Sequence, residues 1–281
     1  MNDSKTKIPC TVYIMTLNAG PDFKRCLESV QDFDDILVTD GNSTDGTQEL
    51  AKSHGARVIK QVESDEPNIP IADFAVVQNR CIKEAKHDWI FQLDMDESMT
   101  PEINEEIRQV TAKPVEHYAC YVPRHTIYNG RVIKYSTGYQ NYTDSGHEMK
   151  FFNRKSGCAM IKSPHHRLEF DQEKYPIGYL KNKYNAYFTI PEYNEGKHYP
   201  KRFMDMEIIE IRKQSWPNFF YWTVLKRSLK TFKKLLKFIY LYIRYGFKET
   251  FPLKVEFGKI QYSWFIMTGA IRERITGKYR S

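Results

Sequence analysis

Paired cysteines are missing from this sequence. Its five cysteines are widely spaced, no two of them form a Cys-x-x-Cys pair, and their number is odd. A disulfide framework or a zinc site would need cysteines in pairs at short spacings. The composition therefore indicates neither, and it is typical of a protein from a reducing compartment.

Long apolar runs are missing as well. No stretch approaches the roughly 18 uncharged apolar residues of a spanning helix, and the polar segment 1–9 has no apolar core of signal-peptide length. The sequence also has no internal repeat and no low-complexity tract. We expect a protein that is neither exported by a signal peptide nor transmembrane. Its 281 residues, 41% of them hydrophobic, suffice for one large core or one domain with an appendage.

Charge is unevenly distributed. The net charge is +7, but segment 216–281 holds 14 of the 42 basic residues and only 3 of the 35 acidic ones. The preceding 215 residues are therefore net negative. This contrast predicts that the C-terminal segment has a separate role from the rest of the chain.

Strand and helix patterns alternate through the first 110 residues. Such alternation is typical of an α/β fold with a mostly parallel, doubly wound (Rossmann-like) sheet flanked by helices, whose ligands bind at the carboxyl ends of the strands. Asn18, Asp40 and Asp94 follow or end three of these strands. The pattern predicts strands at 11–16, 36–39, 57–62 and 89–94, and helices at 22–31, 47–54, 71–86 and 101–110.

Aromatic, β-rich segments follow residue 110. We expect strands at 118–122, 126–133 and 149–153, with Asn129-Gly130 as the two-residue turn of a hairpin. This half is expected to cover the site and to select a second substrate.

Three acidic residues, Asp94, Asp96 and Glu97, directly follow the apolar strand at 89–94. Crowded negative charge gains nothing for folding alone, so a cation is expected there. An Asp-x-Asp pair at a strand end suits a hard divalent ion that bridges to phosphate. The alternative is that the carboxylates merely cap the following helix, where Thr100-Pro101-Glu102 gives a cap and a proline in the first turn.

Four motifs resemble family 2 glycosyltransferases of the GT-A fold: TVYIMTLNAG, DGNSTDGT, FAVVQNRCI and WIFQLDMDE, in this order. The resemblance covers about the first 110 residues. It implies a nucleotide-sugar donor, with a UDP-sugar expected, and Mg²⁺ or Mn²⁺ as cofactor. It also implies a glycosyltransferase domain at 1–215, divided into a donor-binding half at 1–110 and an acceptor-binding half at 111–215.

The same resemblance implies site residues. Asp40 would hold the nucleotide base, unless it only shapes a turn, as we expect of Asp45. Asp94 would lie by the ribose and phosphate and share the metal with Asp96. Gln78 replaces the arginine usual at its position, which leaves open whether Arg80 compensates. The expected nucleotide-sugar-binding set is Thr16, Asn18, Asp40, Asn79, Arg80 and Asp94.

The stretch MKFFNR at 149–154 resembles, more distantly, bacterial enzymes that extend lipopolysaccharide core or other cell-surface glycans. A His-Glu pair follows in those relatives, whereas this chain has His165-His166. The resemblance implies that His166 replaces the glutamate as general base of an inverting transfer, with Glu169 as the alternative. His165, or less favourably His198, would complete the metal site.

The C-terminal segment 216–281 is expected to form a basic amphipathic helical extension. At about 100° per residue, its apolar residues fall within a stripe about 80° wide, and its basic residues cluster roughly 80° to 140° away from that stripe. Such a helix either packs on the domain or lies on a membrane surface, here the cytoplasmic face. A continuous apolar stripe is not typical of nucleic-acid binding. The stripe is Leu225, Leu229, Phe232, Leu236, Ile239 and Ile243, flanked by Lys226, Lys230, Lys233, Lys237 and Arg244.

Together these features predict a metal-dependent transferase that acts at the membrane on a lipid-linked glycan or lipopolysaccharide core. A nucleotidyltransferase is the first alternative, but its phosphate loop would be basic and glycine-rich, and segment 17–21 has no Lys or Arg. A non-catalytic nucleotide-sugar-binding or membrane-binding protein is the second, supported only by His165-His166. The sequence does not indicate an oligomeric state.

Overall fold

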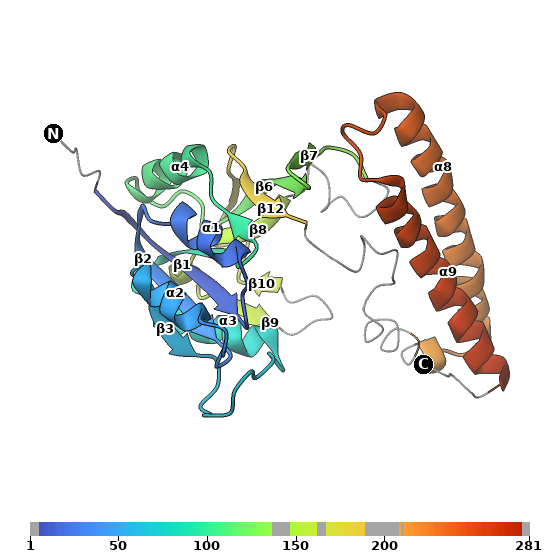
Figure 1. Cartoon of the computed structure of the whole chain (residues 1–281), viewed down its shortest axis with the longest axis horizontal. Coiled ribbons are helices and arrows are strands. Elements are labelled where there is room, and N and C mark those ends of the chain that lie inside the picture. Colours follow the sequence, from blue (N-terminus) through green and yellow to red (C-terminus); the bar gives the residue numbers. More distant parts are fainter. Residues whose placement is uncertain (1–5, 137–146, 162–166, 189–207, 209–210, 277–281) are drawn as a thin grey trace. The chain divides into compact units, whose positions relative to one another are not determined.

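The chain forms two compact units. The computed structural model describes residues 6–136, 147–161, 167–188, 208 and 211–276. The first unit comprises Met1–His125 and Gly146–Tyr187, and the second comprises Thr126–Ser145 and Phe188–Ser281 (Figure 1). The predicted functional division at residue 215 stays a prediction, because compactness does not show which residues bind which substrate.

Four parallel strands, in the order β3-β2-β1-β4, form one half of the sheet in the first unit. Val12 and Ile14 of β1 pack in the cluster on one face and Tyr13 in the cluster on the other, and all three are fully buried. Burial on both faces is typical of a parallel sheet covered by helices. The four strands predicted here are confirmed as β1 (Ile8–Thr16), β2 (Phe33–Asp40), β3 (Arg57–Lys60) and β4 (Trp89–Asp94).

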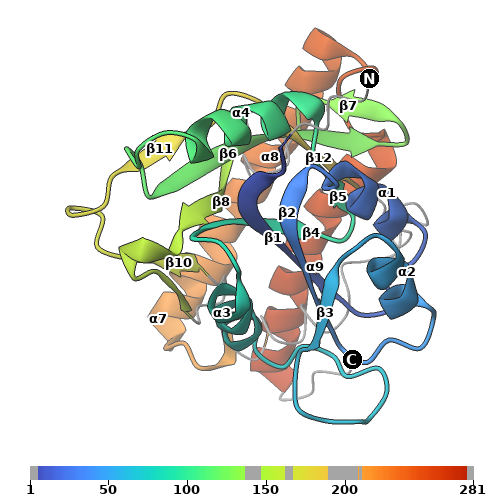
Figure 2. The same ribbon diagram turned by 90° about the vertical axis from the view of Figure 1, so that its left-hand side faces the viewer.

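Helices cover both faces of these strands. In Figure 2, α3 lies on one side and α1 and α2 lie on the other. The predicted start of α3 at residue 71 is three residues early, because the Asp73 side chain accepts a hydrogen bond from the backbone N–H of Ala75 and thereby caps the helix at residue 74. The helices are α1 (Asp22–Ser29), α2 (Thr47–Ser53), α3 (Phe74–Glu84) and α4 (Pro101–Thr111).

Beyond β4 most of the pairings are antiparallel. β8 pairs with β4 and β6 pairs with β8, both antiparallel, whereas β11 pairs with β6 in parallel. The predicted α/β fold, a sheet flanked by helices, is therefore confirmed, with a mixed sheet whose parallel part is mainly the first four strands. The hairpin turn at Asn129-Gly130 is confirmed, with positive φ at both residues. The further elements are β5 (Glu97–Ser98), β6 (Ala119–Tyr128), β7 (Arg131–Ile133), β8 (His147–Asn153), η2 (Arg154–Ser156), β9 (Ala159–Ile161), β10 (Arg167–Glu169), β11 (Ile177–Tyr179) and β12 (Tyr184–Tyr187).

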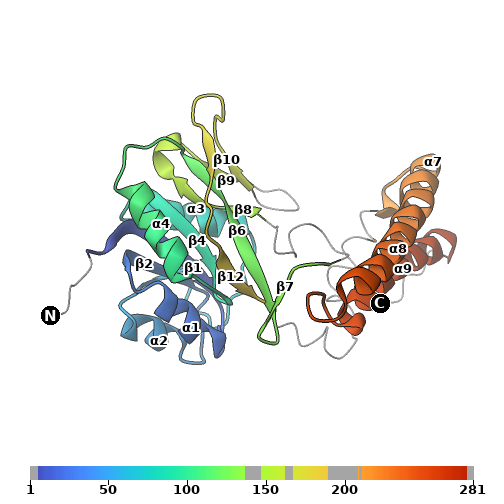
Figure 3. The same cartoon turned by 90° about the horizontal axis from the view of Figure 1, so that it is seen from above.

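The second unit is built around two long helices. α8 and α9 run side by side (Figures 1 and 3). Ser228 of α8 contacts Met267 of α9, and Lys234 of α8 lies within hydrogen-bond distance of Ser263 of α9. The predicted C-terminal helical extension is confirmed as α7 (Trp216–Asn218), the π-helix η3 (Phe219–Lys226), α8 (Arg227–Tyr245) and α9 (Leu253–Thr276). Among the residues that the structure describes, no helix has the length and apolar character to cross a membrane.

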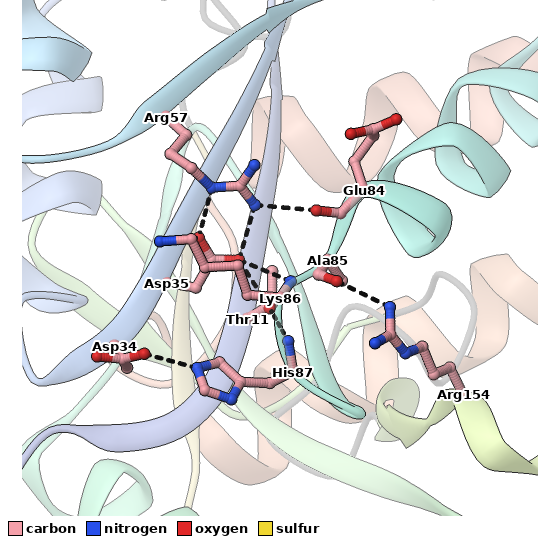
Figure 4. Close-up of polar contacts among 9 residues, drawn as sticks. All are labelled: Thr11, Asp34, Asp35, Arg57, Glu84, Ala85, Lys86, His87 and Arg154. Carbon is pink, nitrogen blue, oxygen red and sulfur yellow. Dashed lines mark hydrogen bonds and ion pairs between the residues drawn. The ribbon is translucent and has the colours of Figure 1, made fainter.

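A buried carboxylate, Asp35, ties the start of β2 to its neighbours (Figure 4). Its side chain is 1% exposed and accepts hydrogen bonds from Thr11 Oγ1 (2.8 Å), Arg57 Nε (2.8 Å) and Arg57 Nη2 (2.9 Å). The backbone N–H of Lys86 donates a further bond at 3.1 Å. Burial alone would raise the pKa of Asp35, but these bonds, that of Arg57 first, lower it below its usual value. The carboxylate therefore fastens three segments of the first unit together.

Replacing this carboxylate should weaken the fold in a pH-dependent way. Asp35→Asn should lower the free energy of unfolding by about 2 kcal/mol at pH 7, less than the roughly 3–5 kcal/mol of a fully buried pair because Arg57 is one-third exposed. Since the folded pKa is depressed, the wild-type advantage is full above the unfolded pKa of about 4 and is lost as the pH falls through the folded value. Urea unfolding at several pH values measures this, and a constant difference down to acid pH would contradict it.

Candidate active site

The turn after β4 presents the predicted carboxylates. Asp94 ends the strand, and its backbone N–H donates a hydrogen bond to Glu97 Oε2 at 2.9 Å. The Asp94 side chain is 48% exposed, whereas Glu97 is buried. Thr100, not a carboxylate, caps α4, because its hydroxyl accepts the bond from the backbone N–H of Ile103. The capping alternative for these carboxylates is therefore wrong.

A buried lysine neutralises part of this turn. Lys150 of β8 is 4% exposed, and its Nζ lies 3.1 Å from Asp94 Oδ2, 2.5 Å from Glu97 Oε2 and 3.8 Å from Glu148 Oε2. Burial alone would lower the pKa of Lys150, but the charges of Asp94 and Glu97 raise it well above its usual value. Burial raises the pKa of Glu97 to about 8, against the opposing effect of Lys150. Because the two groups are in direct contact, we assign a charged lysine.

A second cation completes the cluster. Arg124 Nη1 donates to Glu148 Oε1 at 2.7 Å, and the hydroxyl of Tyr184 donates to Glu148 Oε2 at 3.1 Å. The Tyr184 ring lies 5.1 Å from Lys150 Nζ. Sequence reasoning did not assign Lys150, Arg124 or Tyr184 to the site. The one available signal was a lysine within the apolar strand segment Met149–Asn153, since a charge in a buried strand requires a partner.

The charges of this cluster fit a divalent cation. The carboxyl groups of Asp94, Glu97 and Glu148 contact the two cations and Asp96 follows in the same turn, so the carboxyl groups outnumber the cations by two. Burial raises the pKa of Asp96 above its usual range, and the charge of Asp94 adds to the rise, whereas the charge of Lys150 opposes it.

The number of carboxylates at this turn also matches what proteins usually supply to a metal ion that is bound together with a nucleotide. Mg²⁺ in such sites is typically held by one or two carboxylates together with substrate phosphates. Within the described part of the chain, no group of three or more His, Cys, Asp and Glu side chains is arranged to hold a metal ion. Asp94 and Asp96 are therefore suited to a cation that arrives with phosphate.

Asp40 holds the loop that follows β2. Its side chain is 1% exposed and accepts four hydrogen bonds. Oδ1 receives the backbone N–H of Ser43 and the amide of Gln48, both at 2.8 Å. Oδ2 receives the hydroxyls of Thr16 at 2.8 Å and of Ser43 at 2.6 Å. Because a carboxylate offers about four acceptor sites, a base N–H would have to replace one of these bonds.

Asn18 links three loops at the carboxyl edge of the sheet. It has a positive φ of 48°, and its backbone N–H donates to Ser43 Oγ at 2.8 Å. Its side chain accepts from the backbone N–H of Thr44 at 3.1 Å and donates to Asn68 Oδ1 at 3.0 Å. The structure thus brings Thr16, Asn18 and Asp40 into one hydrogen-bonded network, as their shared edge predicted.

The two predicted residues of α3 contact protein groups. Asn79 exchanges two hydrogen bonds with the backbone of Met160, its Nδ2 to the carbonyl and its Oδ1 from the N–H, each at 2.8 Å. Arg80 Nη2 donates to Glu63 Oε1 at 2.6 Å. Asn79 therefore fastens β9 to α3, and Arg80 holds the segment after β3. Their predicted roles in nucleotide-sugar binding stay predictions.

Only one of the predicted acceptor-side residues is described. Glu169 is exposed at the end of β10, and its carboxylate lies 3.6 Å from Arg167 Nη2. His165, His166 and His198 lie outside the described residues. The assignments of a general base and of a third metal ligand therefore stay predictions.

A surface cleft of about 680 Å³ lies elsewhere in the first unit. It runs along α4 and contains none of the predicted site residues. Its lining includes Glu102, Glu105, Glu106, His117, Tyr179 and Lys181. Glu106 is occupied, because it accepts hydrogen bonds from the backbone of Lys181 and Asn182.

Comparison with known proteins identifies a family. The model of the family described as Glycosyl transferase family 2 matches residues 11–166, more than half of the chain. An uncharacterized glycosyltransferase of Rickettsia prowazekii is 30% identical over 114 residues, which cover 40% of this chain and 36% of that protein. The SPbeta prophage-derived glycosyltransferase SunS of Bacillus subtilis is 30% identical over 116 residues, 39% of this chain and 25% of that protein. The matched segments therefore span about a third or less of these relatives.

Solved structures superpose in part. Residues 1–349 of S. aureus TarS give a TM-score of 0.44 at 16% identity, covering 95% of this chain and 81% of that one. The mannosyltransferase PcManGT of Pyrobaculum calidifontis gives 0.48 at 10% identity, covering 98% and 89%.

Removing the buried lysine should destabilise the first unit strongly. Lys150→Met should lower the free energy of unfolding by about 3–5 kcal/mol, because it leaves Glu97 buried without its cation. Adding Glu97→Gln should recover part of this loss, which a double-mutant cycle in urea measures. Lys155→Met is the matched control, since Lys155 is 66% exposed and its pair with Asp88 is worth about 1 kcal/mol or less. Equal effects at positions 150 and 155 would contradict the assignment.

Proposed function

The chain belongs to glycosyl transferase family 2, and from this premise we propose that it transfers a sugar from a UDP-sugar to a hydroxyl group of a lipid-linked glycan or lipopolysaccharide core. The transfer is metal-dependent and inverts the configuration of the sugar. The observation that carries the proposal is the excess of negative charge where β4 ends, at Asp94 and Asp96. A protein with no cationic ligand gains nothing from such an arrangement.

The donor diphosphate and the carboxylates need a common cation. Asp94 and Asp96 would hold Mg²⁺ or Mn²⁺, which when bound neutralises the charge that develops on the leaving diphosphate. Lys150 contacts one carboxylate oxygen of Asp94 and thereby holds the turn in place. His165 is the proposed third protein ligand.

The nucleotide binds at the neighbouring strand ends. Thr16 and Asn18 line its pocket, and Asp40 accepts the base N–H in exchange for one of its four bonds. The amide of Gln48 is the group that we expect to be displaced, because it is the one side-chain donor to Asp40 Oδ1. Asn79 and Arg80 lie on α3, and Arg80, which contacts a mostly exposed glutamate and the backbone carbonyl of Gln61 at 3.5 Å, is the candidate for a phosphate contact.

Sugar transfer requires one base. The acceptor oxygen attacks the anomeric carbon from the side opposite the nucleotide, the bond from that carbon to the diphosphate oxygen breaks, and its electron pair leaves with UDP. The base removes the proton of the acceptor hydroxyl. His166 is the proposed base, with Glu169 as the alternative.

The second unit gives the reason for a lipid-linked acceptor. α8 exposes a continuous apolar stripe beside lysines, which suits a membrane surface better than bulk water. We place the protein peripherally on the inner face of the cytoplasmic membrane, where a lipid-linked acceptor and a soluble UDP-sugar meet.

Loss of one aspartate should abolish turnover. Asp96→Asn should reduce Mn²⁺-dependent UDP release from the preferred UDP-sugar by about 10²–10³-fold, because the carboxylate that would hold the cation is removed. UDP release without acceptor is measured across a panel of UDP-, GDP- and TDP-sugars, with Mn²⁺ or with EDTA.

Asp34→Asn is the matched control for this test. Asp34 is 49% exposed and pairs with His87 at the opposite edge of the sheet (Figure 4). This variant should keep wild-type activity. Full activity of Asp96→Asn, or turnover that is unchanged in EDTA, would contradict the metal-dependent mechanism. Failure of the wild-type chain to bind any nucleotide-sugar in calorimetry would contradict the transferase itself.

The general base can be identified by measuring kcat for transfer and the affinity for the donor separately in variants of His166 and Glu169. If His166 removes the acceptor proton, His166→Ala should lower kcat for transfer by about 10²–10⁴-fold and leave donor affinity unchanged. Glu169→Gln should then change kcat little. The opposite pattern would assign the base to Glu169, and an equal loss of donor affinity in His166→Ala would show a role in donor binding instead.

A further inference from the structure

We infer that the outward face of α8 is a binding surface for an anionic lipid bilayer. The face consists of Leu225 at the end of η3 and, on α8, Leu229, Phe232, Leu236, Ile239 and Ile243; it is called the apolar stripe below. The inference deepens the proposed function, on which it rests for its purpose, by naming the partner of the second unit.

The apolar stripe is exposed along its whole length. Its six side chains have between 47% (Ile239) and 82% (Ile243) of their surface accessible. They recur every three or four residues and so lie on one side of the helix. Isolated exposed apolar residues are normal on proteins, but a row of six large ones is a binding surface.

The opposite side of α8 is already occupied. Lys234, which lies within hydrogen-bond distance of Ser263 of α9, and the buried Leu241 are on that side. The Tyr242 hydroxyl donates a hydrogen bond to the backbone carbonyl of Phe251, in the segment before α9. α8 therefore uses one side to form its helical pair and leaves the apolar stripe for another partner.

Basic residues identify the kind of partner. Lys230, Lys233, Lys237 and Arg244 are exposed and lie beside the apolar stripe, and none of the described residues of α8 is acidic. A positively charged face along one side of an apolar stripe is complementary to anionic headgroups above acyl chains.

Exposed aromatic residues before α8 also favour a membrane as the partner. Trp216, Phe220, Tyr221 and Trp222 each expose 51% or more of their surface. Lys226 Nζ lies 3.6 Å from the centre of the Trp222 ring. Tryptophan and tyrosine beside lysine are enriched where a protein meets the headgroup layer.

The test uses vesicle sedimentation of the full chain. Wild-type protein should sediment with vesicles of equal parts phosphatidylglycerol and phosphatidylcholine, and weakly with phosphatidylcholine alone. A higher salt concentration should release the protein from the vesicles, because it screens the attraction between the lysines and the anionic headgroups. Lys230→Gln/Lys233→Gln/Lys237→Gln should weaken binding to the anionic vesicles by about 100-fold, at about 1 kcal/mol per lysine.

Leu236→Glu tests the apolar part of the surface. It should weaken binding by about tenfold or more, because an apolar side chain that would enter the membrane becomes charged. Val115→Glu, which places the same charge on an exposed apolar position of the first unit, should bind as the wild type does. Acceptor-independent UDP release should be equal in all these proteins, which separates failure of this inference from failure of the proposed transferase.

Other partners would give different results. If a second copy covers the apolar stripe, wild-type protein will be dimeric by ultracentrifugation, Leu236→Glu will be monomeric and neither will bind vesicles. If the first unit covers it, wild-type protein will be monomeric and will not sediment with any vesicle. Either result overturns the inference.

Discussion

The proposed chemistry depends on an imbalance of charge at the end of β4. Four carboxylates and two cations share this corner of the first unit, and Lys150 lies among them with 4% of its surface exposed. Burying this lysine is favourable only because Asp94 and Glu97 contact it directly. It neutralises part of the turn, and the remaining negative charge is available to a divalent cation. The fold thus keeps the turn ordered, and the proposed cation would bind at the carboxylates that remain.

Much of the first unit could be predicted from the sequence because its signals are local. Apolar strand segments, the cap at Thr100 and the turn at Asn129-Gly130 each depend on a few neighbouring residues, and all of them are confirmed. The adjacency of Asp94 and Asp96 is equally local. The partner that neutralises this turn is not, since Lys150 is separated from Glu97 by 53 positions and reaches it only through the pairing of β8 with β4.

Residue roles were harder to predict than residue positions. Asn79 lies on the predicted helix, yet its amide forms two bonds with the backbone of Met160 on β9, 81 positions away, which no helical pattern encodes. Asp40 lies at the predicted strand end, and its four bonds to Thr16, Ser43 and Gln48 show that an aspartate there also serves the fold. The apolar stripe of α8 could be predicted, because its residues recur every three or four positions in the sequence. The packing of α9 against the other side of α8 could not be predicted from that pattern.

The most direct test of the account is the coupling between metal and nucleotide. Calorimetry would measure the affinity of the wild-type chain and of Asp96→Asn for UDP, each with Mn²⁺ and with EDTA. A shared cation predicts that Mn²⁺ strengthens UDP binding to the wild-type chain by at least about tenfold, and that Asp96→Asn loses this coupling. If UDP binds the wild-type chain equally well with and without Mn²⁺, the excess carboxylates of this corner do not hold a cation for the donor.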